Sequence, residues 1–185
     1  MNLEKIPAVI LCGGKSSRMK QDKCFLKIKN KSLIQYQYEK LNKIFNKVYI
    51  STKIDKFDKK FPNLILDDEA LYSPMLALYT SLKTFNDSFV FICAVDMPNI
   101  SKIEIQALFE KINLSKVVIP KTKDGIHCLC GFYHSSLSSL CENFLKKDIH
   151  KIKLFAKEAK AYELEFKNDK AFLNLNFYED YLKNV

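Results

Sequence analysis

Features that would indicate a membrane or exported protein are missing from this sequence of 185 residues. Its longest apolar run covers only residues 89 to 95, whereas a bilayer-spanning helix needs about 20 apolar residues. The apolar segment near the N-terminus is broken by Gly13, so we expect no signal peptide. We therefore expect a cytoplasmic protein, in which the six cysteines are free thiols.

Arginine and glycine are both scarce. Arg18 is the only arginine among the 30 basic residues, and Gly13 and Gly14 are half of the four glycines. The net charge of +9 predicts attraction to anions, either a phosphorylated small molecule or a nucleic acid. Because the lysines are spread along the whole chain, without an arginine and aromatic stripe or a basic tail, we expect no nucleic-acid partner.

The scarce residues meet in the stretch from 7 to 26. The apolar run Ala8–Leu11 shows no alternation and stops at the glycine pair, which is typical of a buried strand in a parallel sheet. The two glycines let backbone N–H groups approach an anion, and Ser16 adds a hydroxyl donor. Arg18 and Lys23 add positive charge, and a guanidinium can hold two phosphate oxygens at once. The stretch predicts a phosphate-binding loop, although the glycines alone would fit an ordinary turn.

The spacing within this loop excludes two common nucleotide motifs. A P-loop needs a glycine where this chain has Val9, and a GxGxxG motif needs a further glycine between positions 15 and 19. From 11 to 23 the chain reads Leu-Cys-Gly-Gly-Lys-Ser-Ser-Arg-Met-Lys-Gln-Asp-Lys. This string resembles the signature of the molybdenum cofactor guanylyltransferases, a branch of the nucleotidyltransferases, with Lys20 in place of one glycine.

Strand and helix patterns alternate along most of the chain. Apolar runs predict strands, and serine caps at Ser32, Ser73 and Ser101 predict helix starts. We expect the first and the last to form capping boxes with Gln35 and Glu104. Such alternation predicts an α/β fold with a doubly wound, mostly parallel sheet. The expected strands cover 8–11, 48–51, 64–66, 89–95, 117–119, 127–133 and 162–164, and the expected helices start near 33, 74, 102, 137 and 149.

Asp96 follows the longest apolar run, which we expect to be the central strand. Ligands bind at the carboxyl ends of parallel strands, and Mg²⁺ prefers carboxylate and phosphate oxygens. Asp96 is therefore a candidate ligand for Mg²⁺, although an aspartate in a turn before a helix would look the same.

His127, Cys128, Cys130 and His134 lie within eight residues and have the side chains of a zinc site. On an extended strand, however, Cys128 and Cys130 would face away from His127. We expect no structural metal here.

The resemblance implies a Rossmann-like nucleotidyltransferase fold in a single domain, 1–185. Its nucleotide-binding half would cover about 1–100 and its acceptor-binding half about 101–185, with a small antiparallel element on the substrate side. It also implies transfer of GMP from GTP to the phosphate of molybdopterin, with Mg²⁺, and with Arg18, Lys23 and Asp96 as catalytic residues. A phosphate monoester is already mostly ionised at neutral pH, so no general base is required.

The resemblance assigns further site residues by motif. The implied nucleotide-binding residues are Leu11, Cys12, Gly13, Gly14, Ser16, Lys23, Ser51, Asp68 and Asp96, with Asp67 as the alternative to Asp68. Asn174-Leu175-Asn176 resembles the family's Asn-x-Asn segment, and the implied acceptor-binding residues are His127, Lys151, Asn174 and Asn176.

Two other functions fit the same residues. One is a related transferase that uses CTP or another phosphorylated acceptor, and the other is a GTP-binding protein that delivers the cofactor without turnover. We also expect a monomer that makes transient contacts with molybdoenzymes and with other cofactor-biosynthesis proteins.

Overall fold

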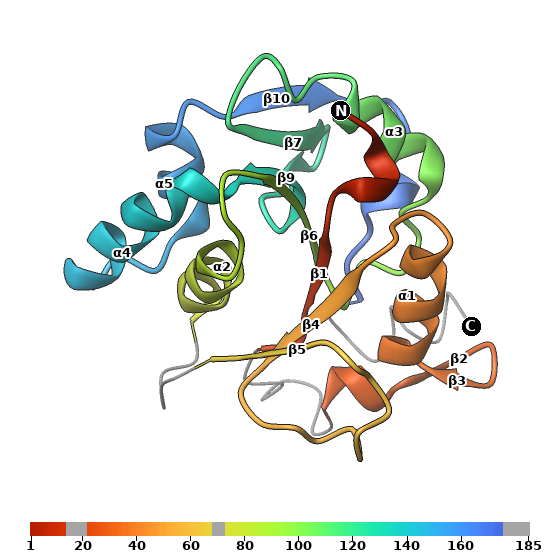
Figure 1. Ribbon diagram of the computed structural model, residues 1–185. Coiled ribbons are helices and arrows are strands. Elements are labelled where there is room, and N and C mark those ends of the chain that lie inside the picture. Colours follow the sequence, from red (N-terminus) through yellow and green to blue (C-terminus); the bar gives the residue numbers. More distant parts are fainter. Residues whose placement is uncertain (14–21, 68–72, 176–185) are drawn as a thin grey trace.

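The structure is a computed structural model of the chain, and it describes residues 1–13, 22–67 and 73–175. Its centre is an eight-stranded sheet with the strand order β10-β7-β9-β6-β1-β4-β5, in which β8 pairs with β7 (Figure 1). The strands are β1 (Ala8–Leu11), β4 (Val48–Thr52), β5 (Leu64–Leu66), β6 (Phe89–Ala94), β7 (Val117–Thr122), β8 (Gly125–Ile126), β9 (Cys130–His134) and β10 (Tyr162–Glu165).

The sheet is mostly parallel, as predicted. β1 pairs in parallel with β4 on one side and with β6 on the other, and β4 and β7 pair in parallel with β5 and β10. The exception in this strand order is β9, which lies between β6 and β7 and is antiparallel to both. A separate antiparallel pair is formed by β2 (Lys27–Ile28) and β3 (Lys31–Ser32).

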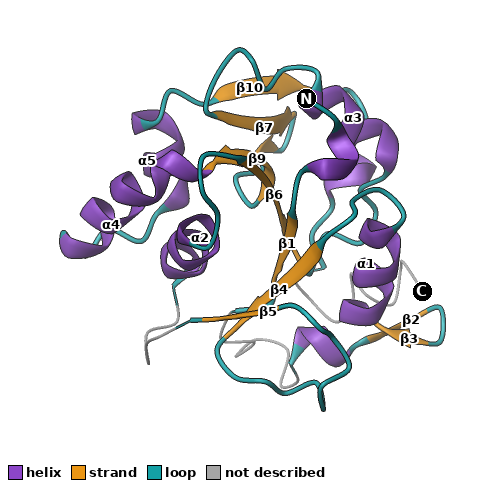
Figure 2. Cartoon of the chain, viewed as in Figure 1, coloured by secondary structure: helices purple, strands orange, loops and turns teal. Residues whose placement is uncertain are grey.

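Helices cover both faces of the sheet, which confirms the doubly wound arrangement. Figure 2 shows α2, α4 and α5 on one face and α1 and α3 on the other. The helices are α1 (Leu33–Asn42), α2 (Pro74–Lys83), α3 (Lys102–Phe109), α4 (Ser138–Lys146) and α5 (Ile152–Glu158). Short 3-10 turns occur at Leu3–Lys5, Lys23–Phe25, Ser135–Leu137 and Asp169–Phe172. No helix in the described ranges is long and apolar enough to cross a membrane.

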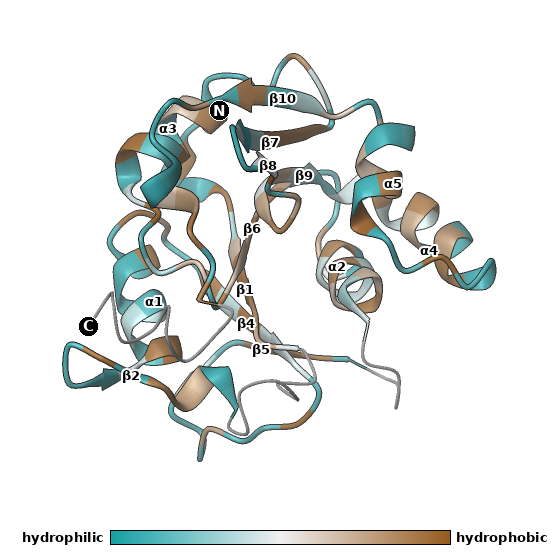
Figure 3. Cartoon of the chain, turned by 180° about the vertical axis from the view of Figure 1, so that it is seen from behind, coloured by the Kyte–Doolittle hydropathy of each residue, from teal (hydrophilic) through white to brown (hydrophobic). Residues whose placement is uncertain are grey.

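Burial on both faces explains why the central strands show no alternation of apolar and polar residues. Ala8 and Ile10 pack on the side of α1, and Val9 and Leu11 pack on the side of α2. All four side chains are buried. Figure 3 accordingly shows β1 and β6 in the hydrophobic colour.

The predicted serine caps are present. Ser73 accepts hydrogen bonds from the backbone N–H groups of Met75 and Leu76, and Ser101 forms the capping box with Glu104. Ser32 caps α1 by accepting the N–H of residue 35, whose side chain donates to Glu39 instead of reaching back to the cap. Local capping chemistry thus sets where these helices begin.

The region after β7 differs from the prediction. The expected strand 117–119 continues through Thr122 as β7, because pairing with β8 and β10 extends it. The expected strand from His127 begins only at Cys130, since residues 127 to 129 form the turn between β8 and β9. Strand geometry therefore does not set the side-chain directions of His127 and Cys128.

Candidate active site

A cavity of about 390 Å³ opens where β1 and β6 end. Parallel pairing brings these ends together, because Leu11 is in register with Ala94 and its carbonyl oxygen accepts the N–H of Val95 at 3.1 Å. The predicted site residues that line the cavity are Leu11, Cys12, Gly13, Lys23, Asp96, His127 and Asn174. A second hollow of about 590 Å³, beside α1, is lined by none of the predicted residues.

An ion pair in this cavity joins the 3-10 turn that follows the glycine pair in the sequence to the segment that follows β6. Lys23 Nζ lies 3.0 Å from Asp96 Oδ2, and each side chain is about 20% exposed. Lys23 begins the 3-10 turn Lys23–Phe25, and Asp96 follows β6. The cavity therefore holds a cation and a carboxylate in contact, both accessible from solvent.

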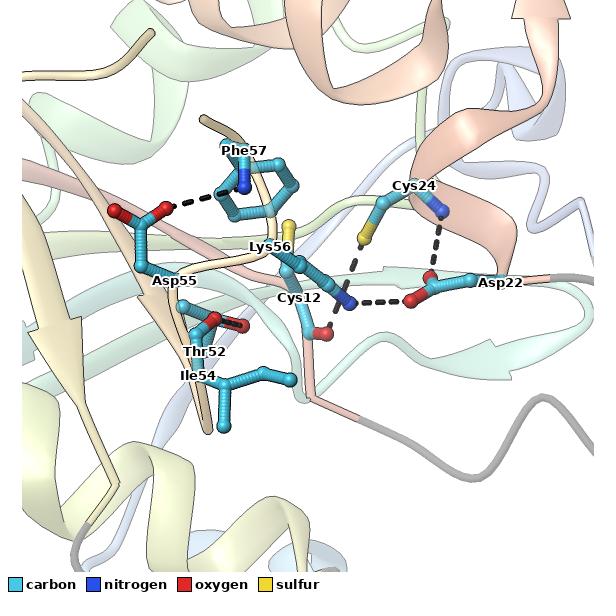
Figure 4. Close-up of polar contacts among 8 residues, drawn as sticks. All are labelled: Cys12, Asp22, Cys24, Thr52, Ile54, Asp55, Lys56 and Phe57. Atoms are coloured by element: carbon cyan, nitrogen blue, oxygen red, sulfur yellow. Dashed lines mark hydrogen bonds and ion pairs between the residues drawn. The ribbon is translucent and has the colours of Figure 1, made fainter. Parts of the chain in front are cut away.

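Asp22, the residue before Lys23 in the chain, forms a second ion pair with Lys56 (Figure 4). Lys56 Nζ lies 2.5 Å from Asp22 Oδ2, and Asp22 Oδ1 accepts the N–H of Cys24 at 3.1 Å. Asp22 thereby caps the turn that carries Lys23. Burial acts to raise the pKa of the Asp22 carboxyl, but the hydrogen bonds from Lys56 and Cys24 outweigh burial and lower it.

Sequence reasoning missed Lys56. It lies in the loop between β4 and β5, among several other lysines, and no local pattern distinguishes it. Burial acts to lower the pKa of its ammonium, whereas the hydrogen bond to Asp22 raises it, and the net result is a raised pKa. Lys56 is therefore a stable cation at neutral pH.

The cysteines near the cavity are packing residues. Cys12 and Cys24 are both buried, and Cys24 Sγ donates to the Cys12 carbonyl oxygen at 3.9 Å (Figure 4). Burial raises the pKa of the Cys12 thiol well above its ordinary value, so it is not ionised at neutral pH. All six cysteines of the chain are free thiols.

Ser51 is fully buried and does not line the cavity. Its hydroxyl donates to Asp67 Oδ1 at 3.4 Å. The other oxygen of Asp67 lies beside the start of the glycine loop, since a Cβ added at Gly13 would be 3.7 Å from Asp67 Oδ2. The structure thus places the carboxylate of Asp67, at the end of β5, next to Gly13.

His127 and Asn174 also line this cavity, and His127 belongs to the turn before β9, the strand on the far side of β6 from β1. The His127 ring stacks on Phe172 at a centroid distance of 5.3 Å, and its Nε2 lies 2.9 Å from Thr122 Oγ1. Burial lowers the pKa of His127, so the ring is neutral at neutral pH. The backbone N–H next to Asn174, that of Leu175, donates to the Asp96 carbonyl oxygen at 2.8 Å.

Lys151 is exposed at the start of α5 and is not among the residues that line the cavity. Its neighbour His150 instead connects α2 to the turn before α5, because His150 Nδ1 lies 2.7 Å from the hydroxyl of Ser73. The predicted residues Gly14, Ser16, Arg18, Asp68 and Asn176 lie outside the described residues.

The cavity suits a hard divalent ion that is shared with a phosphate. Mg²⁺ is usually bound through one or two carboxylates, with phosphate oxygens and water as the other ligands. The carboxylate of Asp96 is exposed to the cavity and meets that need. Within residues 1–13, 22–67 and 73–175, no three His, Cys, Asp or Glu side chains are grouped to hold a metal by themselves.

Comparisons with known proteins agree with this geometry. Residues 8–161 match the sequence model of one family, the MobA-like NTP transferase domain. A molybdenum cofactor guanylyltransferase of Campylobacter jejuni subsp. doylei is 50% identical over 186 residues, which covers 99% of this chain and 97% of that protein. A protein of the same name from Helicobacter pylori strain G27 is 32% identical, covering 97% of this chain and 91% of its own.

A solved structure shares the fold. The molybdopterin-guanine dinucleotide biosynthesis protein A of Archaeoglobus fulgidus matches this chain with a TM-score of 0.84 and 19% identity. The match covers 97% of this chain and 96% of that one. At this identity the similarity concerns the fold alone.

The first prediction concerns Lys56. A lowered pKa of Asp22 contributes stability above the pKa of the unfolded carboxyl, and this stability is lost as the pH falls through the folded-state pKa. Lys56→Met should therefore lower the free energy of unfolding at pH 7, and its difference from the wild type should shrink as the solution is acidified. Denaturant unfolding at several pH values measures this, with the exposed Lys60→Met as control. A difference that is independent of pH would contradict the role of the Asp22 charge.

Proposed function

The chain belongs to the MobA-like NTP transferase family, and we propose that it transfers GMP from GTP to the phosphate of molybdopterin, releasing pyrophosphate. One observation carries the proposal. The Lys23–Asp96 ion pair faces the cavity in a chain that is 50% identical, over almost its whole length, to a named molybdenum cofactor guanylyltransferase. The reaction needs cations and a metal-binding carboxylate at the same end of the sheet, and this pair supplies both.

On the nucleotide side, the triphosphate would lie against the segment that follows β1. Leu11, Cys12 and Gly13 line the cavity there, and Gly14 and Ser16, next in the sequence, would add N–H and hydroxyl donors. Lys23 and Arg18 neutralise the charge that develops on the α-phosphate and on the leaving pyrophosphate. These contacts hold the α-phosphorus in line with the attacking oxygen.

Asp96 is the residue that would hold Mg²⁺, and Lys23 is its counter-ion in the absence of nucleotide. When bound, Mg²⁺ would withdraw charge from the phosphate oxygens and help to orient the triphosphate. With Asp96 holding the ion, Lys23 would contact the phosphates and neutralise part of their charge.

The acceptor is a phosphate monoester, which is already mostly dianionic at neutral pH because its second pKa is about 6. It can attack without a general base. A neutral His127 imidazole, stacked on Phe172, would not form an ion pair with the acceptor phosphate. His127 acts by positioning the acceptor.

The acceptor-binding residues we propose are His127, Asn174, Asn176 and Lys151. His127 and Asn174 come from distant parts of the second half of the chain and line the same cavity. Lys151, exposed on α5, would meet the phosphate or the pterin only at the rim. In this arrangement residues 1–100 bind the nucleotide and residues 101–185 bind the acceptor, within one continuous sheet.

For the guanine base we propose a carboxylate at the end of β5. Guanine offers its N1–H and 2-amino group as donors, so Asp68 or its neighbour Asp67 can read it. Ser51 would help to orient the Asp67 carboxylate, because its hydroxyl donates a hydrogen bond to Oδ1. A monomeric state, a cytoplasmic location and contacts with molybdoenzymes stay predictions from the sequence.

The second prediction tests the reaction itself. With molybdopterin and Mg²⁺, the protein should release pyrophosphate from GTP at least about tenfold faster than from CTP, ATP or UTP, because one lost base contact at a buried site costs about 1–3 kcal/mol. A coupled pyrophosphate assay measures the four rates. Faster release from CTP would identify a cytidylyltransferase, and GTP binding without release would identify a delivery protein.

The third prediction tests the acceptor side. Asn174→Ala should raise the KM for molybdopterin while the KM for GTP stays near the wild-type value, since Asn174 belongs to the second half of the chain, which we propose binds the acceptor. The same assay, run with each substrate varied in turn, gives both constants. Equal loss for both substrates would show that Asn174 only anchors the segment next to Asp96.

A further inference from the structure

The turn that carries Asp96 is held by donors from outside the turn. Three consecutive carbonyl oxygens of this turn accept hydrogen bonds: that of Asp96 from Leu175 N at 2.8 Å, that of Met97 from Gln37 Nε2 at 2.8 Å, and that of Pro98 from Lys40 Nζ at 2.7 Å. Two of the three donors are side chains of α1. The backbone directly after Asp96 is therefore fixed from the helix behind it.

The burial of Gln37 carries a cost in folding stability. Its side chain is fully buried, and within the described ranges its Oε1 is the one buried side-chain oxygen or nitrogen without a hydrogen-bond partner. A buried, unsatisfied polar atom costs about 1–3 kcal/mol. Besides Met97, its amide nitrogen contacts only a weak acceptor, Cys93 Sγ at 3.8 Å. A leucine at this position would remove the unsatisfied oxygen, but would leave the Met97 carbonyl oxygen without its donor.

Lys40 lies one helical turn further along the same face of α1. Burial lowers the pKa of its ammonium to about 8, so holding the charge there opposes folding at neutral pH. The ammonium nevertheless ends on the Pro98 carbonyl oxygen. Two residues that are both costly to bury thus converge on adjacent carbonyls of one turn.

We propose that Gln37 and Lys40 are positioning residues, which fix the turn Asp96–Pro98 and thereby aim the Asp96 carboxylate into the cavity. The inference rests on the proposed function, in which Asp96 holds the metal. A metal that demands near-octahedral geometry tolerates little motion in its carboxylate, so a fixed backbone raises metal affinity. Residues that orient a ligand in this way typically change metal affinity by about 10–100-fold when they are removed.

The fourth prediction separates positioning from stability. Gln37→Leu removes the donor and the unsatisfied oxygen together but leaves the Met97 carbonyl oxygen without its donor, so the free energy of unfolding should stay near that of the wild type. When each protein is bound to a non-hydrolysable GTP analogue, the variant should bind Mn²⁺ at least about tenfold more weakly than the wild type does. The affinity for the analogue without metal should not change. Lys40→Met should behave in the same way.

The measurements are titration of Mn²⁺ followed by the electron paramagnetic resonance signal of the free ion, and denaturant unfolding. Gln35→Leu is the matched control, because it makes the same substitution on the exposed part of α1. Gln37→Met, which keeps the length and flexibility of the side chain, replaces Gln37→Leu if leucine prevents folding.

Asp96→Asn separates this inference from the proposed function. If Asp96→Asn abolishes Mn²⁺ binding while Gln37→Leu and Lys40→Met keep wild-type affinity, the positioning role is overturned and the proposed function stands. A loss of stability in both α1 variants with unchanged Mn²⁺ affinity would likewise overturn it. If Asp96→Asn also binds Mn²⁺ normally, the metal site of the proposed function is overturned together with the inference.

Discussion

The ion pair between Lys23 and Asp96 joins the two parts of the sequence that make the site. The residues are 73 positions apart, and they meet because β1 and β6 are neighbouring parallel strands whose ends lie in register. Each side chain alone would be an ordinary partly exposed charge. Together they place a cation and a carboxylate on one cavity, which nucleotidyl transfer requires.

Both partners are held from behind by polar contacts. Asp22 and Lys56 fix the turn that carries Lys23, and two side chains of α1 fix the turn that carries Asp96. A buried glutamine with an unsatisfied oxygen is a poor choice for stability alone. A residue that lowers stability next to a site indicates that it is kept for the geometry of the site, here the turn that carries Asp96.

Much of the fold could be predicted because its signals are local. Serine caps set helix starts, and apolar runs at Ala8–Leu11 and Phe89–Ala94 set the central strands. The antiparallel position of β9 depends on contacts between distant segments, and no local pattern encodes it. The predicted start of a strand at His127 was wrong for the same reason, since pairing of β7 with β8 and β10 decides where these strands end.

The candidate site was predictable where a motif or a strand end marked it, as at Lys23 and Asp96. Lys56 could not be found, because it is one lysine among many and its partner is distant in sequence. Gln37 did leave a signal. It interrupts the apolar stripe of α1 between Leu33 and Leu41, and a polar residue in a buried stripe indicates a specific partner.

The most direct test of the ion pair's role is the affinity for GTP of Asp96→Asn, measured by calorimetry with and without Mg²⁺ beside the rate of pyrophosphate release. Without metal, the variant should bind GTP at least as tightly as the wild type, because it lacks the negative charge of Asp96 beside Lys23 that would repel the triphosphate. Mg²⁺ should no longer strengthen binding, and turnover should fall by on the order of 100-fold or more. Wild-type turnover, or undiminished strengthening by Mg²⁺, would contradict the account.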